Sequence, residues 1–552
     1  MNQYVNTELQ KALIFHQAAR LNDAEKSYKK ALKSSPENVT ILTNLGNIYL
    51  QKSDEKNALI LIEKSLKIYP NQSLAWNNIG NIYLNSGNIK RAIDCFSQAI
   101  YFKSDYLIAY KNKANALYLT ENYKDSLDNY EKIVQLNPDF AEAYFGIGNI
   151  HHELKNFEKA LAYFNKAILL KADVAEYFNN RGNLHADMNH LQEALLDYDQ
   201  AILLKPDLAD AYNHKGNLHE DLLEYSTALN CYDKAISIKP DHANAQWNRS
   251  LLKLLMGNYL EGWKLYEWRW KSVRTSLKRE FSEPLWMGDF SINNKSIFIF
   301  SEQGYGDAIQ FCRYIPILEG MGARVIFEVP GNLLQIMATL SSSVVLIPNG
   351  TTLPKFDCYC PLISLPHAFA TVIETIPSKI PYLRSSQNKR ELWKNKLTGE
   401  GKPRIGIVWS GSNEHLNDKR RSLALQQLEA IFNLPVEFHS IQKEIRDIDI
   451  DVLMQFDMIH QHQHDLIDFD DTAALIDELD LIISVDTSVA HLAASMGKEV
   501  WILLPLTPDF RWMLDREDSP WYPTVRLFRQ TKLDKWDDVI SRIRTELENK
   551  YL

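Results

Sequence analysis

One pattern of small, aromatic and helix-ending positions repeats every 34 residues through the first half of the chain. Its glycines are Gly46, Gly80, Gly148, Gly182 and Gly216, and its second small position holds Ala24, Ala58, Ala92, Ser126, Ala160, Ala194 and Ala228. Its ring position holds Tyr28, Ile62, Phe96, Tyr130, Phe164, Tyr198 and Tyr232, and its prolines are Pro36, Pro70, Pro138, Pro206 and Pro240. Small residues let two helices approach, a ring fills the gap, and proline ends the second helix. The pattern therefore predicts consecutive pairs of packed helices.

These registers resemble those of the tetratricopeptide repeat, with seven copies over residues 1–240. One helix pair cannot bury its apolar face alone, so we expect the copies to stack into a superhelix with a concave inner wall. Residues 241–277 leave the register and concentrate aromatic residues, namely Trp263, Tyr266, Trp268 and Trp270. We expect capping helices and a linker there, with an apolar face that docks on the next domain. Stacking of these rings on a sugar or base is the alternative.

Two asparagine columns follow the same 34-residue period. One contains Asn47, Asn81, Asn115, Asn149, Asn183 and Asn217, and the other, three residues earlier, contains Asn44, Asn78, Asn112, Asn180 and Asn248. Positions three apart share a helix face, and a carboxamide both donates and accepts hydrogen bonds. We therefore expect a groove that grips a peptide backbone, an arrangement that resembles the asparagine ladder of eukaryotic O-linked N-acetylglucosamine transferase. The alternative is that these amides bridge neighbouring repeats.

Beyond residue 278 the period changes to short apolar runs of strand length. The runs are 296–300, 323–329, 344–349, 404–410, 481–486 and 499–505, and helical patterns lie between them. Strands that alternate with helices indicate parallel sheets. A charged stretch at 385–402 divides the region, so we expect two Rossmann-like lobes over 278–395 and 396–552, with ligands at the carboxyl ends of the strands.

Three loops at predicted strand ends carry candidate functional residues. In the first, Asp307 can act as a general base towards a hydroxyl nucleophile, with Glu302 and Gln303 beside it in the cleft; simple capping of the following helix is the alternative. The second holds the small residues Ser410, Gly411 and Ser412 and the cations Arg420 and Arg421, which suit a diphosphate unless the charge run is only a solvated surface. The third begins a helix and holds Asp486, Thr487, Ser488 and His491, where free backbone N–H groups favour an anion.

Two stretches carry a more specific resemblance. The first reads GDAIQFCRYIPIL and begins at residue 306, and the second reads VDTSVAHLAASMGKEVWILLP and begins at residue 485. They are similar to the two signature regions of glycosyltransferase family 9. The resemblance spans roughly 295–545 and implies a GT-B fold and inverting, metal-independent transfer from a nucleotide-diphosphate sugar. By position it makes Asp307 the catalytic base, Asp486 the carboxylate near the donor sugar, Thr487 and Ser488 the phosphate cradle, and Arg421 the cation on the diphosphate.

The chain also departs from that family. Its first lobe is shorter, and heptosyltransferases of the family lack a repeat array. The resemblance therefore does not identify the donor nucleotide sugar or the acceptor. The expected fold is a tetratricopeptide-repeat superhelix followed by a GT-B double Rossmann-like module, a layout that is similar to O-linked N-acetylglucosamine transferase.

The amino-acid composition limits the kinds of partner and the cellular compartment that we expect. Lys and Arg number 61 against 70 Asp and Glu, a net charge of −9, so we expect no nucleic-acid partner. The five cysteines form no C-x-x-C pair, which favours a reducing compartment without a disulfide framework. We see no signal peptide and no run of about 18 apolar residues, so we expect a cytoplasmic protein without a transmembrane segment.

Two further patterns look like metal ligands, but we expect no metal and no cofactor besides the nucleotide sugar. The D-x-D spacing from Asp447 to Asp451 lies in a tract, 441–480, with 12 acidic and 2 basic residues, so chance explains it. His460, His462 and His464 share one face of an extended segment, yet no carboxylate or thiol spacing in the sequence completes a known site. Elsewhere, the loop-like segment with Arg511 and Trp512 is expected at the cleft, and packing against the C-terminal helix is the alternative.

Together these features favour a glycosyltransferase whose repeat array recruits a protein or peptide acceptor. One alternative is an interaction scaffold whose transferase domain is inactive. Another is transfer to a glycan or lipopolysaccharide acceptor, with the repeats used for assembly only.

Overall fold

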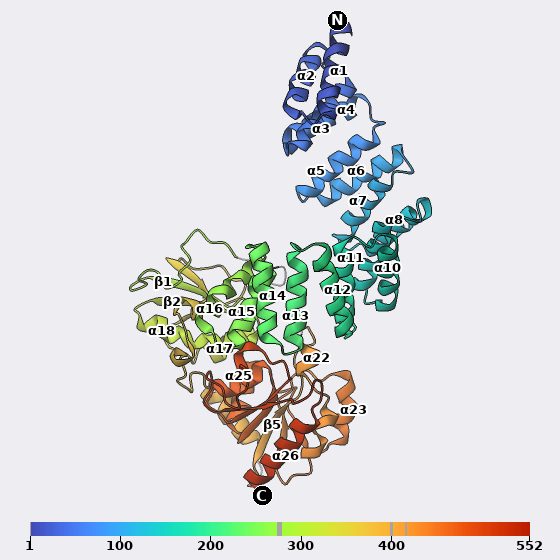
Figure 1. Cartoon of the computed structure of the whole chain (residues 1–552). Coiled ribbons are helices and arrows are strands. Elements are labelled where there is room, and N and C mark those ends of the chain that lie inside the picture. The colour runs from blue at the N-terminus through green and yellow to red at the C-terminus, as the bar shows by residue number, and fades with distance from the viewer. Residues whose placement is uncertain (1, 273–278, 398–400, 415–416) are drawn as a thin grey trace. The chain divides into compact units, whose positions relative to one another are not determined.

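The computed structural model describes residues 2–272, 279–397, 401–414 and 417–552. Its N-terminal region is a succession of antiparallel α-helices joined by short turns (Figure 1). They are α1 (Asn2–Gln17), α2 (Leu21–Ser34), α3 (Val39–Gln51), α4 (Glu55–Ile68), α5 (Ser73–Asn85), α6 (Ile89–Phe102), α7 (Leu107–Tyr118), α8 (Tyr123–Leu136), α9 (Ala141–Glu153), α10 (Phe157–Leu170), α11 (Ala175–Asp187), α12 (Leu191–Leu204), α13 (Ala209–Asp221), α14 (Tyr225–Ile238), α15 (Ala243–Leu255) and α16 (Tyr259–Tyr266).

The repeating register is explained by the contact between the two helices of a pair. Where the first helix of a pair carries the register's glycine, that glycine faces the ring position of the second helix, 16 residues later. A Cβ on Gly80 would lie 2.4 Å from the ring of Phe96, and one on Gly182 would lie 2.7 Å from the ring of Tyr198. At Gly46 the partner is Ile62, the aliphatic member of the ring column. The ring fills the space that an alanine methyl would otherwise occupy, so the predicted packing of small residue against ring is confirmed.

Two parallel sheets follow the helices. The first contains β1 (Ser296–Phe300), β2 (Arg324–Val329), β3 (Val345–Pro348) and β4 (Cys358–Pro361), in the order β3-β2-β1-β4. The second contains β5 (Arg404–Val408), β6 (Glu437–Ser440), β7 (Ile459–Gln461), β8 (Leu481–Val485), β9 (Val500–Leu504) and β10 (Val525–Arg529), in the order β10-β9-β8-β5-β6-β7. Neighbouring strands run parallel in both.

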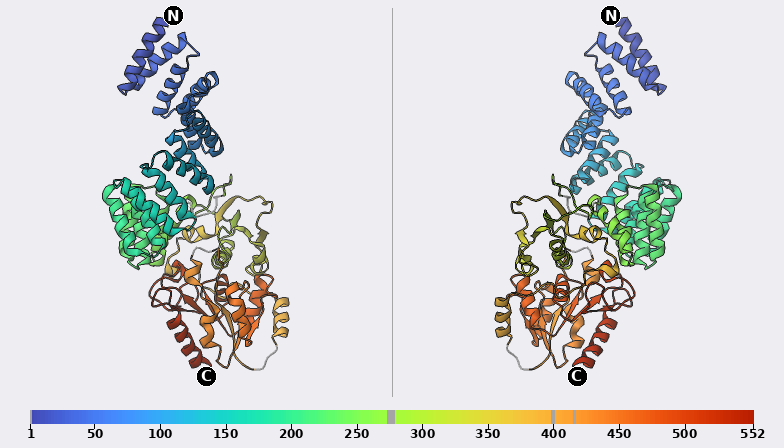
Figure 2. Two further views of the ribbon diagram at one scale, coloured as in Figure 1. Left: turned by 90° about the vertical axis from the view of Figure 1, so that its right-hand side faces the viewer. Right: turned by 90° about the vertical axis from the view of Figure 1, so that its left-hand side faces the viewer.

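Helices between the strands make this region α/β, and the views in Figure 2 separate the yellow-green first sheet from the orange-red second one. These helices are α17 (Tyr305–Phe311), α18 (Ile315–Gly320), α19 (Leu334–Met337), α20 (Leu365–Ala368), α21 (Gln387–Lys396), α22 (Asp418–Arg421), α23 (Asp447–Gln455), α24 (Phe469–Asp477), α25 (Ser488–Ser495) and α26 (Asp537–Tyr551). Short 3-10 turns are η1 (Glu267–Lys271), η2 (Cys312–Tyr314), η3 (Gly331–Leu333), η4 (Leu362–Ser364), η5 (Ile373–Thr375), η6 (Leu425–Ile431) and η7 (Phe510–Trp512).

All six predicted strands are present, and four others were not predicted. The missed strands are β4, β6, β7 and β10. Two of them, β6 (EFHS) and β7 (IHQ), are short and largely polar, because a strand at or next to a sheet edge needs little apolar sequence. Hydrophobic runs therefore identified the centres of the sheets better than their borders.

The contacts divide the chain into two compact units, Met1–His214 and Lys215–Leu552. The sequence analysis placed a boundary at residue 240 instead. The difference arises because α14, α15 and α16 contribute to the core of the C-terminal unit: Tyr232, Leu252 and Trp263 belong to one buried cluster with Ile297 of β1 and Ile502 of β9.

The aromatic helix α16 docks on the sheet region, as the sequence analysis expected. Trp263 is 1% exposed, and its ring lies 5.7 Å from that of Phe311 and 5.6 Å from that of Phe510. Tyr259 accepts a 3.0 Å hydrogen bond from the indole of Trp521. Trp263 and Tyr266 are buried in this packing and cannot stack on a ligand, whereas Trp268 and Trp270 remain partly exposed.

Substitution of Gly80 by alanine tests the helix-pair packing. The added methyl meets the fully buried ring of Phe96, and such overpacking typically costs about 1–3 kcal/mol, against a helix-propensity gain of up to about 1 kcal/mol. We expect the free energy of urea unfolding, followed by circular dichroism, to fall by about 1–2 kcal/mol. Gly320→Ala, where a Cβ meets no atom within 4 Å, is the matched control. An equal effect of the two substitutions would refute a steric role for Gly80.

Candidate functional site

Two helix starts, one from each sheet, lie against each other. α17 follows β1 and α25 follows β8, and a Cβ on Gly306 would lie 3.1 Å from Cδ2 of His491 and 3.7 Å from Cα of Ser488. β1 stands between β2 and β4, and β8 stands beside β5, so both loops leave their sheets where the strand order reverses. Ligands of open parallel sheets bind at such positions. The loops around Asp307 and Asp486 therefore share one site.

Asp307 lies at the start of α17 and is joined to the guanidinium of Arg511 by an ion pair. Its other oxygen accepts a 3.1 Å hydrogen bond from the N–H of Gly304, so the capping role left open by the sequence is present. The side chain is 16% exposed. Because each carboxylate oxygen has two lone pairs, Asp307 retains acceptor capacity for a hydroxyl group.

Arg511, on η7 after β9, connects this carboxylate to the second lobe. Its Nε donates to Oε1 of Gln310 over 2.8 Å, and its Nη1 donates to Oδ1 of Asp509 over 2.7 Å. Burial and the neighbouring carboxylates act in opposite directions, and the net effect raises the pKa of Arg511. The sequence placed Arg511 near the cleft but did not identify Gln310 or Asp509.

Asp486 directly follows β8, and its side chain is 14% exposed. Burial and the neighbouring Asp509 raise its pKa to about 6, and Arg421 opposes this shift. Arg421 donates from Nη1 to the backbone oxygen of Asp486 over 2.9 Å. The same guanidinium lies over Gly411, where a Cβ would be 2.5 Å from Nη2. Arg421 thus spans the loops after β5 and β8, where the sequence placed a diphosphate.

His491 is 4% exposed and lies in the first turn of α25. Its Nδ1 lies 2.9 Å from the hydroxyl of Tyr522, its Nε2 lies 3.7 Å from Asp486, and its ring stacks on Trp512 at a 19° interplanar angle. Burial and three arginines lower its pKa well below the ordinary value. The ring is therefore neutral, and it shapes the site without adding positive charge.

The remaining residues of the two donor loops differ in accessibility. Ser410 is 2% exposed, and its Oγ has no hydrogen-bond partner within the described residues. Ser412 is exposed and accepts from the N–H of Glu414 at 3.3 Å. Thr487 caps α25 by accepting from the N–H of Ala490. Ser488 is half-buried at the first position of that helix, so its N–H is among those without an intrahelical partner.

Arg420 does not join this group. Its guanidinium forms two hydrogen bonds, of 2.6 and 3.3 Å, with the carboxylate of Asp221 at the end of α13. Nothing in the spacing of residues 418–422 indicates this partner, which is 199 residues away. Arg420 is thus engaged by Asp221, and its expected role at a diphosphate stays a prediction. Arg446, which the sequence analysis missed, contacts Asp418 and the backbone of Gly411 instead.

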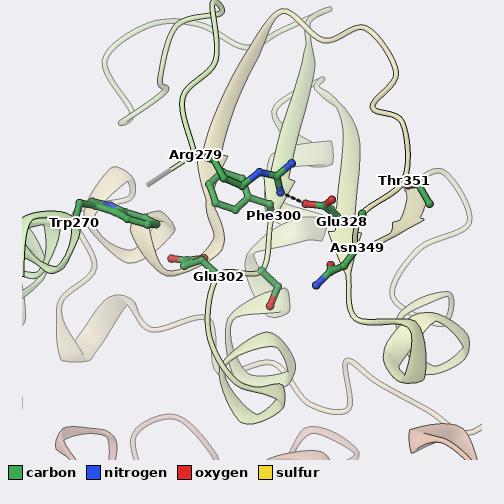
Figure 3. Close-up of a pocket in the computed structure, with 9 residues that line it drawn as sticks. Trp270, Arg279, Phe300, Glu302, Glu328, Asn349 and Thr351 are labelled. Carbon is green, nitrogen blue, oxygen red and sulfur yellow. Dashed lines mark hydrogen bonds and ion pairs between the residues drawn. The ribbon is translucent and has the colours of Figure 1, made fainter. Parts of the chain in front are cut away.

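A pocket of about 450 Å³ opens at the carboxyl edge of the first sheet (Figure 3). It is lined by Trp270, Arg279, Phe300, Ser301, Glu302, Glu328, Asn349, Gly350 and Thr351. Figure 3 shows Trp270 and Glu302 on one side and Asn349 and Thr351 on the other, with the Arg279–Glu328 ion pair between them. Aromatic faces together with carboxylates, amide and hydroxyls suit a ligand rich in hydroxyl groups.

Glu302 is the chemically most distinctive residue of this pocket. One oxygen accepts from Arg269 at 2.9 Å and from the N–H of Ile363 at 3.3 Å, and Oε2 has no partner within the described residues. Burial raises its pKa to about 7, against the lowering effect of Arg269. Gln303 turns the other way and exchanges hydrogen bonds with Tyr266. Arg269, 1% exposed and also bonded to Ser364, was missed by the sequence analysis.

The asparagine columns bridge neighbouring repeats. Asn78 donates to Asn47 over 2.9 Å, Asn112 to Asn81 over 3.2 Å, Asn180 to Asn149 over 2.9 Å and Asn248 to Asn217 over 2.8 Å. The tyrosines at 130, 198 and 232 donate to Asn115, Asn183 and Asn217. Most of these amides, with Asn44, are half-buried, and Asn115 is exposed. The structural interpretation, in which these amides bridge neighbouring repeats, is therefore confirmed, and their expected contact with a peptide stays a prediction.

The central aspartate of the D-x-D segment, Asp449, stabilises the fold. The segment forms the start of α23, where Asp449 is 1% exposed and accepts hydrogen bonds from the Trp409 indole at 2.9 Å and from the N–H of Leu425 at 2.8 Å. A carboxylate so engaged holds two segments of the second lobe together.

Comparisons with known proteins identify the helical region. Residues 9–73 and 111–174 match one tetratricopeptide-repeat family model, residues 73–106 and 209–242 match a second, and residues 175–208 match a third. The chain is similar to Protein FlbA of Caulobacter vibrioides, with 24% identity over 330 residues. That alignment covers 55% of this chain and 55% of FlbA, so the chain spans about half the length of this curated relative.

Two solved structures are also similar. A tetratricopeptide repeat protein from Parabacteroides merdae has 20% identity and a TM-score of 0.40, over 48% of this chain and 98% of that one. YrrB, described as a TPR protein with an unusual peptide-binding site, has 25% identity and a TM-score of 0.27, over 34% of this chain and 98% of that one.

Among the described residues, no helix combines the length and the apolar character needed to cross a lipid bilayer. The family matches end at residue 242 and cover the helix pairs but not the two sheets. The N-terminal region of this chain is therefore an array of tetratricopeptide repeats, as its 34-residue register predicted.

Proposed function

We propose that the C-terminal unit is an inverting glycosyltransferase of the GT-B fold, which uses a nucleotide-diphosphate sugar and no metal ion, and that the repeats recruit a protein or peptide acceptor. The observation that carries the proposal is the contact between the starts of α17 and α25. It brings Asp307 from the first lobe together with Asp486, Arg421 and a free helix N-terminus from the second.

The proposed reaction needs two things from these residues. A base must take the proton of the acceptor hydroxyl, and Asp307 is the candidate because its carboxylate is held at the junction of the lobes by Arg511. The departing diphosphate must be stabilised, and Arg421 with the N–H groups at the start of α25 supplies fixed positive charge. Each well-placed donor of this kind contributes roughly 10²–10³ in rate.

The acceptor side rests on two features. Tetratricopeptide arrays are protein-interaction scaffolds, and this one presents partly exposed amides along its first helices. The pocket beside Glu302 lies at the same sheet edge as the Asp307 loop, so it is a site for the hydroxyl-bearing part of the acceptor. A glycan acceptor fits that pocket equally well, and the repeats would then serve assembly only.

A scaffold without transfer activity is the second candidate function. It is favoured by the engagement of both Asp307 oxygens, one with Arg511 and one with Gly304. The two functions differ in one respect that can be measured: a transferase binds nucleotides.

Asp307→Asn separates base catalysis from binding. A positioned general base contributes about 10²–10⁴ in rate, so transfer from nucleotide sugars, measured as nucleoside diphosphate released with peptide or glycan acceptors, should fall by at least about 100-fold. Calorimetric affinity for the nucleotide should be unchanged. Glu374→Gln, which alters an exposed carboxylate of the same lobe, is the control. Full activity of the Asp307→Asn variant would exclude the base role, and absence of heat with every nucleotide would favour the scaffold.

Arg421→Ala tests the diphosphate site. Loss of a hydrogen bond to a charged group is worth about 1.5–3 kcal/mol, so the dissociation constant of the nucleoside diphosphate should rise about 10- to 100-fold. Lys419→Ala removes an exposed charge two residues away and should change affinity little. Equal effects of both substitutions would indicate that only the overall charge of the segment matters.

Nucleotide-sugar affinity should depend on pH through Asp486. Its raised pKa, about 6, means that the carboxylate is neutral below pH 6 and anionic above it. An anion beside the diphosphate is repulsive, so affinity should weaken as pH rises from 5 to 7, by at most about tenfold per pH unit. In Asp486→Asn the affinity should be flat over this range. His491 does not contribute, because its pKa is already lowered well below the ordinary value. A slope that survives in Asp486→Asn would assign it to another group.

A further inference from the structure

The histidine-rich segment acquires in the fold the carboxylate that its sequence lacks. Its first histidine, His460, lies on β7, the edge strand of the second sheet, and is paired in register with His439 of β6. Residues two apart on a strand share a face, which adds Glu437 of β6 to the pair. One ligand atom of each of these three residues lies within 4.8 Å of the other two.

His439 is oriented by a second histidine. It is 1% exposed, and its Nδ1 lies 3.0 Å from Nε2 of His462. Its own Nε2 is 3.9 Å from the Glu437 carboxylate and has no hydrogen-bond partner within the described residues.

A neutral imidazole carries one N–H. In the tautomer whose Nδ1 donates to Nε2 of His462, the Nε2 of His439 offers its lone pair towards Glu437 and His460, which is the form that binds an ion. In the other tautomer an N–H faces the Glu437 oxygen 3.9 Å away, and binding of an ion displaces that proton. A histidine that donates from one nitrogen and offers the other is the usual form of a metal ligand with an outer partner.

The spacing of the rings agrees with binding to one ion. The rings of His439 and His460 have centroids 4.7 Å apart at an interplanar angle of 20°. With Zn–N bonds of about 2.1 Å, two imidazoles on one ion place their centroids about 5 Å apart. The Glu437 oxygen that lies 3.9 Å from Nε2 of His439 is the one that Arg404 approaches at 3.5 Å. A carboxylate oxygen has two lone pairs, so this contact leaves one for an ion.

We propose that Glu437, His439 and His460 form a binding site for a divalent transition metal, with Zn²⁺ as the best match for two imidazoles and a carboxylate. His460 is exposed, so a water completes the coordination from the solvent side. The ion joins the edge strand β7 to β6. The site is independent of the proposed transfer site, because β5 and β6 stand between β7 and β8.

Zinc titration of the full chain tests the site. After treatment with EDTA and its removal, calorimetry and elemental analysis should give one tightly bound Zn²⁺ per chain. His460→Ala changes an exposed ligand and should weaken binding by at least about 100-fold, more than the loss of an outer partner typically causes. His464→Ala, which removes an exposed histidine of the same segment that is not part of the cluster, should bind zinc as the wild type does.

Two further measurements make the outcome specific. Glu437→Gln should also weaken Zn²⁺ binding, and Co²⁺ substituted for Zn²⁺ should give visible d–d absorption that His460→Ala abolishes. Zn²⁺ should raise the melting temperature of Asp307→Asn by as much as that of the wild type, because this substitution leaves the three proposed ligands unchanged. Wild-type affinity no greater than that of His460→Ala, or equal loss in His464→Ala, would overturn the proposal.

Discussion

A buried guanidinium fixes the relation between the two sheets of the C-terminal unit. Arg511 is 9% exposed, and an isolated charge in such a position costs several kcal/mol. Its partners Asp307 and Gln310 both lie on α17, whereas Asp509 lies on the loop that carries Arg511 itself. The start of α17 must therefore meet this loop. Because Trp512 of the same loop stacks on His491 at 5.2 Å, the start of α25 is held there too.

Contacts between residues close in the sequence could be predicted, whereas contacts between residues far apart in the sequence could not. The 34-residue register encodes a contact between positions 16 residues apart, Gly80 against Phe96 for example, so the repeats could be predicted in full. Loops at strand ends follow from local pattern, which is why Asp307 and Asp486 were found. Gln310 and Arg511 are 201 residues apart and Arg269 and Ser364 are 95 apart. No periodicity encodes which buried charge meets which partner, so these pairings were missed.

The asparagine columns hold neighbouring repeats together, and recognition of a peptide by the same amides is part of the proposed function. Each bridge uses a donor of one amide and the oxygen of the next, as between Asn78 and Asn47. A carboxamide has two donors and an oxygen with two lone pairs, so a bridge leaves further groups to face solvent. A peptide would therefore meet amides whose orientation is already fixed, which reduces the conformational entropy lost on binding.

The ion pair between Arg420 and Asp221 links the last turn of a repeat helix to the segment that carries Arg421. Both side chains are more than 40% exposed, and pairs of this kind contribute about 0–1 kcal/mol. That range sets an upper limit on the coupling free energy through this contact: a change at the end of α13 can shift an equilibrium at the Arg421 segment through it by no more than about fivefold. The repeat helix that ends at Asp221 and the segment that carries Arg421 are thus close to thermodynamically independent along this route.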